Sequence, residues 1–378
     1  MALHSLYAHL WSIADRGVEC FADDLQRAGL GACSYAATYH AVRQLMPGNP
    51  RRAIFHCPRS HAYFRPRGHY GRLAPLPSPL LRPGAGLEAV CAALGRRGLR
   101  VKAWVVGGHN SDLAGACPDC AVQGPLGDPH PHHLCPAHPE VAAYLEALAV
   151  DLAAHHELAA LELESFCYPE RFEHGAHHEM SGVPADPWHS RLLSLCFCPW
   201  CRPPAGLRAA VAAELRAWLA TPAWELASRP SHAVRDAAAA FAAAHPELDA
   251  LLAGQRRTVA ELGARLRAAV RRVAPSTALI DLGGGSAAPS SELGAWADGL
   301  VVRADPVAVR AARDILGAAM DVGVGLYMLA PTPLTPTQLR ETVCACAAAG
   351  AVSFNYYNHG LMPEAAWHDI AGAARANP

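Results

Sequence analysis

The chain has 378 residues, of which 52% are hydrophobic, and its formal net charge is −1. This length and composition predict a soluble globular protein with one large core. A charge so close to neutral gives no support for binding to nucleic acid or to a membrane surface, so we expect neither partner. The N-terminal residues lack a secretory-signal pattern and no apolar run could span a bilayer, so we expect a cytoplasmic protein.

Short apolar segments alternate along the chain with segments of helical periodicity. We expect eight strands, at residues 6–13, 31–40, 101–108, 159–165, 277–284, 299–304, 323–329 and 351–358. Helices are predicted between them, at residues 18–29, 86–98, 138–156, 205–274, 305–321 and 335–350. Most of the strands are apolar throughout, which is typical of a parallel sheet covered by helices. The predicted fold is therefore α/β, a (β/α)₈ TIM barrel.

A doubly wound sheet is the alternative fold. Such a sheet usually carries a glycine-rich turn after its first strand, whereas here the first strand is followed by ADRG. We predict one barrel domain over residues 1–378, with residues 205–274 as a helical insert. Long connections follow the second, third and fourth strands, at 57–84, 109–138 and 166–204. They are expected at the C-terminal face of the barrel, where the active sites of this fold lie.

Three cysteines lie within six positions of one another in the segment LSLCFCPWCR, namely Cys196, Cys198 and Cys201. In a reducing compartment, such a cluster indicates metal binding more than disulfide formation. A C-x-C-x₂-C run can wrap three thiolates around Zn²⁺, which then needs a fourth ligand from elsewhere. We expect that ligand to be Cys135. The alternatives are Cys117, Cys120 and Cys167. Four thiolates leave no open coordination position, so the predicted zinc site is structural.

This cysteine pattern resembles that of the family 42 β-galactosidases. In those barrel glycosidases, a loop cysteine and a C-x-C-x₂-C run hold zinc near the active-site face. Over most of its length the chain is also similar to bacterial TIM-barrel glycoside-hydrolase-like proteins of unassigned activity. The stretches that carry this likeness are AHLWSIADRG, YHAVRQLMPGNP, YFRPRGHYGRLAP, LCPAHPEV, LELESFCYP and FNYYNHGLMP. The resemblance implies a barrel that acts on a small carbohydrate or glycoside.

Two glutamates in the predicted strand 159–165 are candidate catalytic residues. Glu162 and Glu164 share one face of the strand because side chains alternate, and Glu164 is nearer the C-terminal end, where barrel acids are usually catalytic. Glu162 lies one layer deeper and could instead be an ion-pair partner.

Glycoside hydrolysis usually needs a second carboxyl group. The resemblance implies one after the seventh strand, but GVGLYMLAPTP contains no acid. Asp281 is the candidate that we select. The other available acids are Asp305, Glu173 and Glu179.

Polar and aromatic residues at the other predicted strand ends could line a polyol-binding pocket. Together they offer stacking faces and hydrogen-bond donors, although each alone could simply belong to the core. The candidate substrate-binding residues are His9, Trp11, Tyr39, His40, His109, Asn110, Arg303, Tyr357 and Asn358.

Two other functions stay open beside that of a carbohydrate-active hydrolase using carboxylate acid/base catalysis. His174, His177 and His178 could bind a second, catalytic divalent metal, which would favour a sugar isomerase or lyase. A solvated polar loop is the alternative interpretation of these histidines. The third possibility is a non-catalytic sugar-binding barrel that lacks one acid. Homo-oligomerisation is compatible with all three functions.

Overall fold

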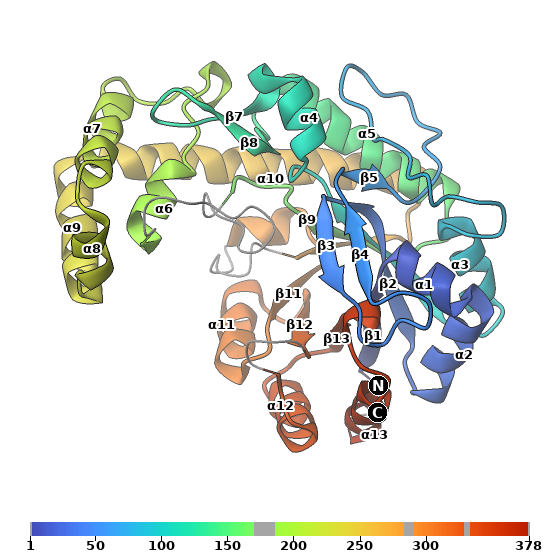
Figure 1. The fold of residues 1–378 in the computed structure, drawn as a ribbon. Helices are drawn as coiled ribbons and strands as arrows, with labels where there is room; N and C mark the ends of the chain where they lie inside the picture. The colour runs from blue at the N-terminus through green and yellow to red at the C-terminus, as the bar shows by residue number, and fades with distance from the viewer. Residues whose placement is uncertain (1, 170–185, 283–290, 329–332, 377–378) are drawn as a thin grey trace.

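Eight parallel strands form a closed barrel in the computed structural model, which describes residues 2–169, 186–282, 291–328 and 333–376 (Figure 1). The barrel closes where β13 pairs with β1, which places Ser353 opposite Leu3. The predicted TIM barrel is therefore confirmed. In the order of their pairing, the strands are β1 (Leu3–Ala8), β2 (Ala32–Tyr39), β6 (Arg100–Val106), β9 (Ala160–Glu164), β10 (Ala278–Asp281), β11 (Gly299–Arg303), β12 (Asp321–Tyr327) and β13 (Ser353–Tyr357).

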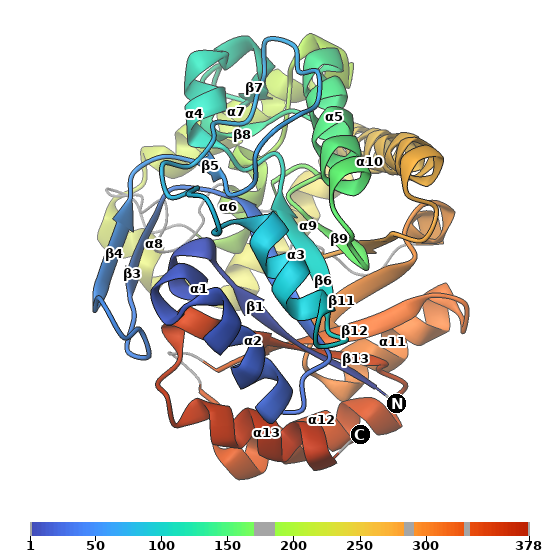
Figure 2. The same ribbon diagram turned by 90° about the vertical axis from the view of Figure 1, so that its right-hand side faces the viewer.

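Helices that connect successive strands cover the outside of the barrel (Figure 2). Asp305 and Thr335 cap two of them, and in each case a proline occupies the first turn. Across the described ranges, no helix has both the length and the apolar character needed to cross a bilayer. The bounds of the helices are α1 Leu10–Arg16, α2 Val18–Arg27, α3 Leu87–Gly95, α5 Pro139–His155, α11 Pro306–Leu316, α12 Pro336–Ala348 and α13 Ala366–Ala376.

The first strand is shorter than its sequence predicts. It ends at Ala8, and the residues after His9 form α1, so Trp11 lies on a helix and not on a strand. Leu10, Trp11 and Ile13 are all buried, and a short apolar run of this kind is compatible with either a strand or a helix.

The two long connections before and after β6 contain small elements of their own. The first includes a hairpin, β3 (Val42–Leu45) with β4 (Ile54–Cys57), and the short strand β5 (His61–Ala62), which lies antiparallel to β2. The second contains α4, β7 and β8, with bounds Ser111–Ala116, Ala121–Gln123 and Pro129–Leu134. Both connections leave C-terminal ends of barrel strands.

The region 205–274 folds as helices, and its helices pack in two ways. One group gathers at one side of the molecule around an apolar cluster of its own that includes Leu207, Leu215 and Phe241 (Figure 1). The long helix α10 instead buries Leu262 and Leu266 in the main core. The helices of this region are α7 Leu207–Leu219, α8 Ala223–Ser228, α9 Ser231–Ala244 and α10 Glu247–Val273. The preceding helix, α6 (Pro187–Leu193), adds Leu192 to the same apolar cluster.

The barrel interior contains a polar layer where this fold usually places branched apolar side chains. Lys102 on β6 forms an ion pair with Glu162 on β9, and its ammonium group also donates to Oδ1 of Asn355 (2.6 Å). Ser5 donates to the same oxygen of Asn355 (2.6 Å). Glu162 is fully buried, and its Oε2 has no hydrogen-bond partner among the described residues. Its charge is therefore balanced mainly by Lys102.

Replacing Lys102 by methionine is expected to destabilise the fold by about 3–5 kcal/mol, because Glu162 would lose its buried counter-ion. The exposed pair Arg265–Glu146 provides the control, since Arg265→Met should cost less than about 1 kcal/mol. Urea unfolding measures both losses. Equal losses in the two variants would contradict the role given to the buried pair.

Candidate active site

Glu164 ends β9 at the C-terminal end of the barrel, on the same face of the strand as Glu162. The indole Nε1 of Trp104 donates a hydrogen bond to Oε2 of Glu164 (2.5 Å). Trp104 lies on the neighbouring strand β6, opposite Glu162 in the register and one layer below Glu164. The alternation of side chains therefore brings the indole and the carboxyl group together inside the barrel.

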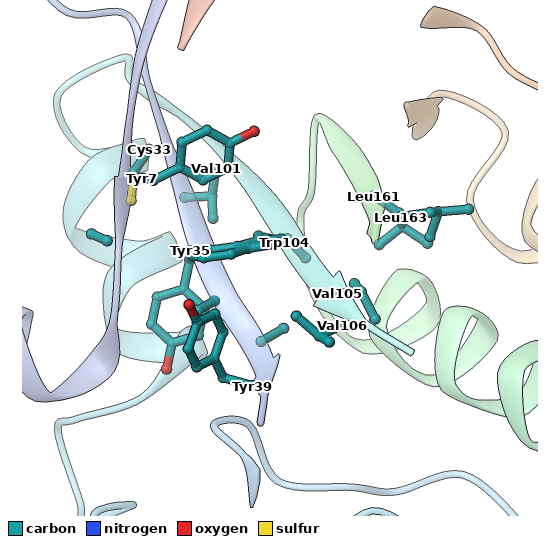
Figure 3. Packing of buried hydrophobic residues seen from close by; sticks show 14 of the residues in the cluster. Tyr7, Cys33, Tyr35, Tyr39, Val101, Trp104, Val105, Val106, Leu161 and Leu163 are labelled. Carbon is teal, nitrogen blue, oxygen red and sulfur yellow. The ribbon is translucent and has the colours of Figure 1, made fainter. Parts of the chain in front are cut away.

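Tyrosine side chains surround this pair. Trp104 makes edge contacts with Tyr7 and Tyr39, with ring centroids 5.0 and 4.9 Å away, and with Tyr357 at 5.8 Å. Figure 3 shows the rings of Tyr7 and Tyr39 around Trp104, while Leu161 and Leu163 of β9 point away from it. Burial, and to a lesser degree the charge of Glu164, raises the pKa of Tyr7, Tyr39 and Tyr357. The carboxyl group thus lies in an aromatic environment.

Burial also raises the pKa of Glu164, because the aromatic surroundings disfavour its charged form. The hydrogen bond from Trp104 acts in the opposite direction and lowers the pKa, since it stabilises the carboxylate. The first effect is the larger. Glu164 is therefore suited to carry a proton at a higher pH than an ordinary glutamate, with a donor in place to stabilise the anion that forms when the proton leaves.

A second group of predicted site residues lies around the ends of β1, β2 and β13. His9 stacks on Trp11 with ring centroids 4.1 Å apart, and Asn358 donates to Nδ1 of His9 (3.2 Å). The hydroxyl groups of Tyr39 and Tyr357 share a hydrogen bond (3.2 Å). The structure thus brings together five of the predicted substrate-binding residues. Trp11 is nevertheless buried behind His9 and stacks on Phe55, which gives it a packing role.

Buried histidines extend this aromatic lining beyond Tyr39. His40 stacks on His109 with centroids 4.4 Å apart, and His109 in turn lies 5.5 Å from His132. His130 and His133 of β8 complete the group, and all five rings belong to residues that are at most 4% exposed. Only His40 and His109 of this group are predicted from the sequence. An antiparallel backbone bridge joins His109, which follows β6, to His133 of β8. The histidines of β8 therefore lie beside the end of β6.

Three other predicted site residues have different surroundings. Asn110 caps α4 by accepting from the backbone N–H of Leu113 (3.0 Å). Arg303 shares the interior face of β11 with its register partner Gly325, but its side chain is 75% exposed and pairs with Asp305 (3.3 Å). Asp281 lies opposite Leu163 in the register of β9 and β10, so it shares the outward face of Leu163 and not the interior face of Glu164. His174, His177, His178, Glu173 and Glu179 lie outside the described residues.

Four cysteines form a group that could bind a metal, and they are Cys135, Cys196, Cys198 and Cys201. Sγ of Cys135 lies 3.6 Å from each of the other three sulfur atoms, and those of Cys198 and Cys201 are also 3.6 Å apart. A tetrahedron of thiolates around a metal with 2.3 Å bonds has sulfur–sulfur distances of about 3.8 Å. The cluster therefore has the donor set and dimensions of such a site.

The cysteine group joins the connections that follow the third and fourth strands. Cys135 comes directly after β8, whereas the other three precede α7. The two segments are also joined by a backbone hydrogen bond from Phe197 to Gln123 (2.7 Å). Tyr168, four residues beyond Glu164, places its hydroxyl group 3.2 Å from Sγ of Cys201. The group thus fixes the chain that leaves the end of β9.

Trp104 is a central residue of this site that was not predicted from the sequence, and the same holds for Tyr7 and the histidines of β8. The segment VKAWVV places Lys102 and Trp104 on one face of β6, and the next strand places Glu162 and Glu164 on one face of β9. Placed side by side, the two alternating patterns pair Glu162 with Lys102 and Glu164 with Trp104. Site residues are predicted only at strand ends, whereas Trp104 lies two residues before the end of β6.

No family model and no curated protein matches the chain. Its fold is similar to those of solved glycoside hydrolases. α-L-Fucosidase isoenzyme 2 from Paenibacillus thiaminolyticus superposes with a TM-score of 0.61 at 16% identity, over 99% of this chain and 49% of that chain. The glycoside hydrolase domain of PgaB (BpsB) from Bordetella bronchiseptica gives 0.57 at 15% identity, over 99% and 98%.

A polyextremophilic β-galactosidase from the Antarctic haloarchaeon Halorubrum lacusprofundi gives a TM-score of 0.57 at 14% identity, over 99% of this chain and 57% of that chain. The chain thus spans about half the length of the fucosidase and little more than half that of the galactosidase. The resemblance to glycoside-hydrolase-like barrels is confirmed, and at these identities it is a likeness of fold.

Trp104→Phe should raise the pKa of Glu164 further, because the variant keeps the aromatic burial and removes the donor that stabilises the carboxylate. Infrared titration of the carboxyl stretch measures this pKa, with the Glu164→Gln variant identifying the band. Tyr39→Phe is the matched control, since Tyr39 contacts the same indole without bonding to Glu164. A pKa that falls in Trp104→Phe, or moves equally in both variants, would contradict this assignment.

Proposed function

We propose that the protein is a glycoside hydrolase in which Glu164 is the catalytic acid. The observation that carries this proposal is the Glu164 carboxyl group, held by the Trp104 indole at the C-terminal end of a barrel strand. Acids at this position of the fold are usually catalytic. The similarity in fold to glycosidases gives independent support for carbohydrate chemistry.

In this proposal, protonated Glu164 donates its proton to the glycosidic oxygen as the bond from that oxygen to the anomeric carbon breaks. The raised pKa keeps the proton on the acid before reaction, and the N–H of Trp104 stabilises the carboxylate afterwards. The same carboxylate can then accept a proton from the attacking water. Glu162 is assigned a structural role, because its charge is engaged by Lys102 one layer below.

The aromatic residues around Glu164 are proposed to hold the sugar ring. Tyr327 ends β12 with a side chain that is 63% exposed, and its ring lies 5.2 Å from that of Tyr357. Tyr357 in turn contacts Trp104, the residue that holds Glu164. Exposed aromatic faces beside an acid suit a ligand with apolar C–H faces and many hydroxyl groups.

A sugar-binding barrel without catalysis is the second candidate. The observation that favours it is the identity of the inward-facing residues at the ends of the barrel strands. In the described part of the chain, Glu164 is the one carboxylate among these inward-facing residues. The resemblance to the family 42 β-galactosidases implies an acid at the end of β12, where this chain has Tyr327. A barrel of this kind would bind sugars through the same aromatic residues.

The four-cysteine group is proposed to hold a structural Zn²⁺. Cys135, Cys196, Cys198 and Cys201 would fill all four positions of a tetrahedral ion, so the metal would supply no Lewis-acid chemistry and would only join the two connections. The sulfur–sulfur distances of 3.6 Å support this fit.

Glu164→Gln is expected to reduce hydrolysis of 4-methylphenyl glycosides by about 10²–10⁴-fold, the usual contribution of a positioned acid. Hydrolysis of the matching 2,4-dinitrophenyl glycosides should fall much less, because that leaving group departs without protonation. Asp281→Asn is the control and should show no dependence on the leaving group, since Asp281 faces outward. Equal losses on both substrates would contradict the role of Glu164, and sugar binding without any turnover in the unmodified protein would favour the second candidate.

The protein is expected to carry one zinc ion per chain in native mass spectrometry. Cys135→Ser and Cys196→Ser should each lose the ion and lower the Tm by roughly 5 °C or more, because binding free energy at such a site contributes to folding. Cys20→Ser, at an exposed cysteine outside the group, should leave both values unchanged. Full zinc occupancy in Cys196→Ser would rule out the assigned ligands.

A further inference from the structure

Trp200 presents an aromatic face to solvent from within the four-cysteine segment. Its side chain is 52% exposed, although Cys198, two residues earlier, is only 2% exposed. Pro199–Cys201 form a short 3₁₀ turn in which the N–H of Cys201 donates to the carbonyl of Cys198 (3.1 Å). Its indole therefore offers a flat apolar face on which a ligand could stack.

The segment that carries Trp200 is held in place on both sides. Sγ of Cys198 and Sγ of Cys201 lie 3.6 Å apart and each is 3.6 Å from Sγ of Cys135. The imidazole of His138 packs against the indole with ring centroids 5.5 Å apart. Little conformational freedom therefore remains to be lost when a ligand stacks on Trp200.

Polar groups in fixed positions are linked to this indole through Cys120 and His138. Arg72 donates to both carboxylate oxygens of Asp119 (3.1 and 2.6 Å) and to both of Glu140 (2.9 and 3.1 Å). It also donates to Sγ of Cys120, which lies 3.8 Å from Nδ1 of His138. The side chains of Arg72, Asp119 and Glu140 are 44%, 59% and 46% exposed. His138 thus connects an indole face to an accessible array of hydrogen-bonding groups.

This combination fits a carbohydrate better than a protein partner. A stable protein interface buries about 800 Å² on each side around an apolar centre, whereas here a single indole stands among charged groups. A sugar ring offers an apolar face for stacking and hydroxyl groups that both donate and accept hydrogen bonds. Asp119 and Glu140 supply acceptors, and Arg72 supplies donors.

Glu164 and Trp200 are linked through Tyr168 and Cys201. Tyr168 follows Glu164 by four residues, so their Cα atoms are at most about 14 Å apart, and its hydroxyl group lies 3.2 Å from Sγ of Cys201, the residue after Trp200. This path limits the separation of Glu164 and Trp200 to roughly 30 Å, which a sugar chain of several units can span. We propose that Trp200, with Arg72, Asp119 and Glu140, is a distal carbohydrate-binding subsite, and that the substrate is an oligo- or polysaccharide. This inference rests on the proposed function.

Native gels cast with soluble galactomannan, arabinogalactan, xyloglucan or dextran test this subsite without any need for turnover. At least one polysaccharide should retard the unmodified protein, and Trp200→Ala should weaken that binding by about tenfold or more, whereas Trp200→Tyr, which keeps a stacking ring, should retain most of it. Trp224→Ala is the matched control, because Trp224 is 74% exposed on α8 and lies outside this group. It should behave like the unmodified protein.

Kinetics provide the second measurement. Trp200→Ala should raise KM for oligosaccharides by about tenfold and leave hydrolysis of an aryl monoglycoside unchanged. Cleavage of aryl glycosides without retardation by any of the four polysaccharides would overturn the subsite and leave the proposed hydrolase intact. Equal retardation of Trp200→Ala and the unmodified protein would overturn it as well. Retardation that depends on Trp200, in a protein that cleaves no glycoside, would support the subsite and contradict the hydrolase alone.

Discussion

The hydrogen bond from Trp104 to Glu164 links the architecture of the barrel to its chemistry. It forms because β6 and β9 are neighbours and because their side chains alternate in the same register. The indole could not hold the carboxyl group if either strand moved by one residue, since every side chain would then change face. The aromatic environment of Glu164 depends on the same register, because the rings that contact Trp104 come from β1, β2 and β13.

The layer below this pair explains why two glutamates on one strand can differ in role. Glu162 is fully buried and its charge is met by Lys102, which Asn355 and Ser5 help to position. Among the described residues, Glu164 has no cation as a hydrogen-bond partner, and burial raises its pKa. The different surroundings therefore make Glu162 a structural partner of Lys102 and make Glu164 suited to hold a proton.

The sequence predicts the barrel well because its signals are local and repeated. Eight apolar strands separated by amphipathic helices specify the fold, and the triplet of cysteines specifies one side of a metal-type cluster. Contacts that depend on register are harder to predict. Asp281 looked like a second rim acid, but its pairing with Leu163 turns it outward. Trp11 looked like part of a strand, because a short apolar run does not distinguish strand from helix. Trp104 was missed because its partner lies 60 residues away.

The cysteine group and the aromatic cluster are joined by the chain from Glu164 to Tyr168. The central claim is that Glu164 meets the bond to be cleaved. A crystal structure of the Glu164→Gln variant with a bound oligosaccharide tests it most directly. We predict a glycosidic oxygen within hydrogen-bonding distance of the side chain at position 164, with a sugar ring against the tyrosines. An oligosaccharide bound elsewhere, with that side chain still bonded only to Trp104, would contradict the claim.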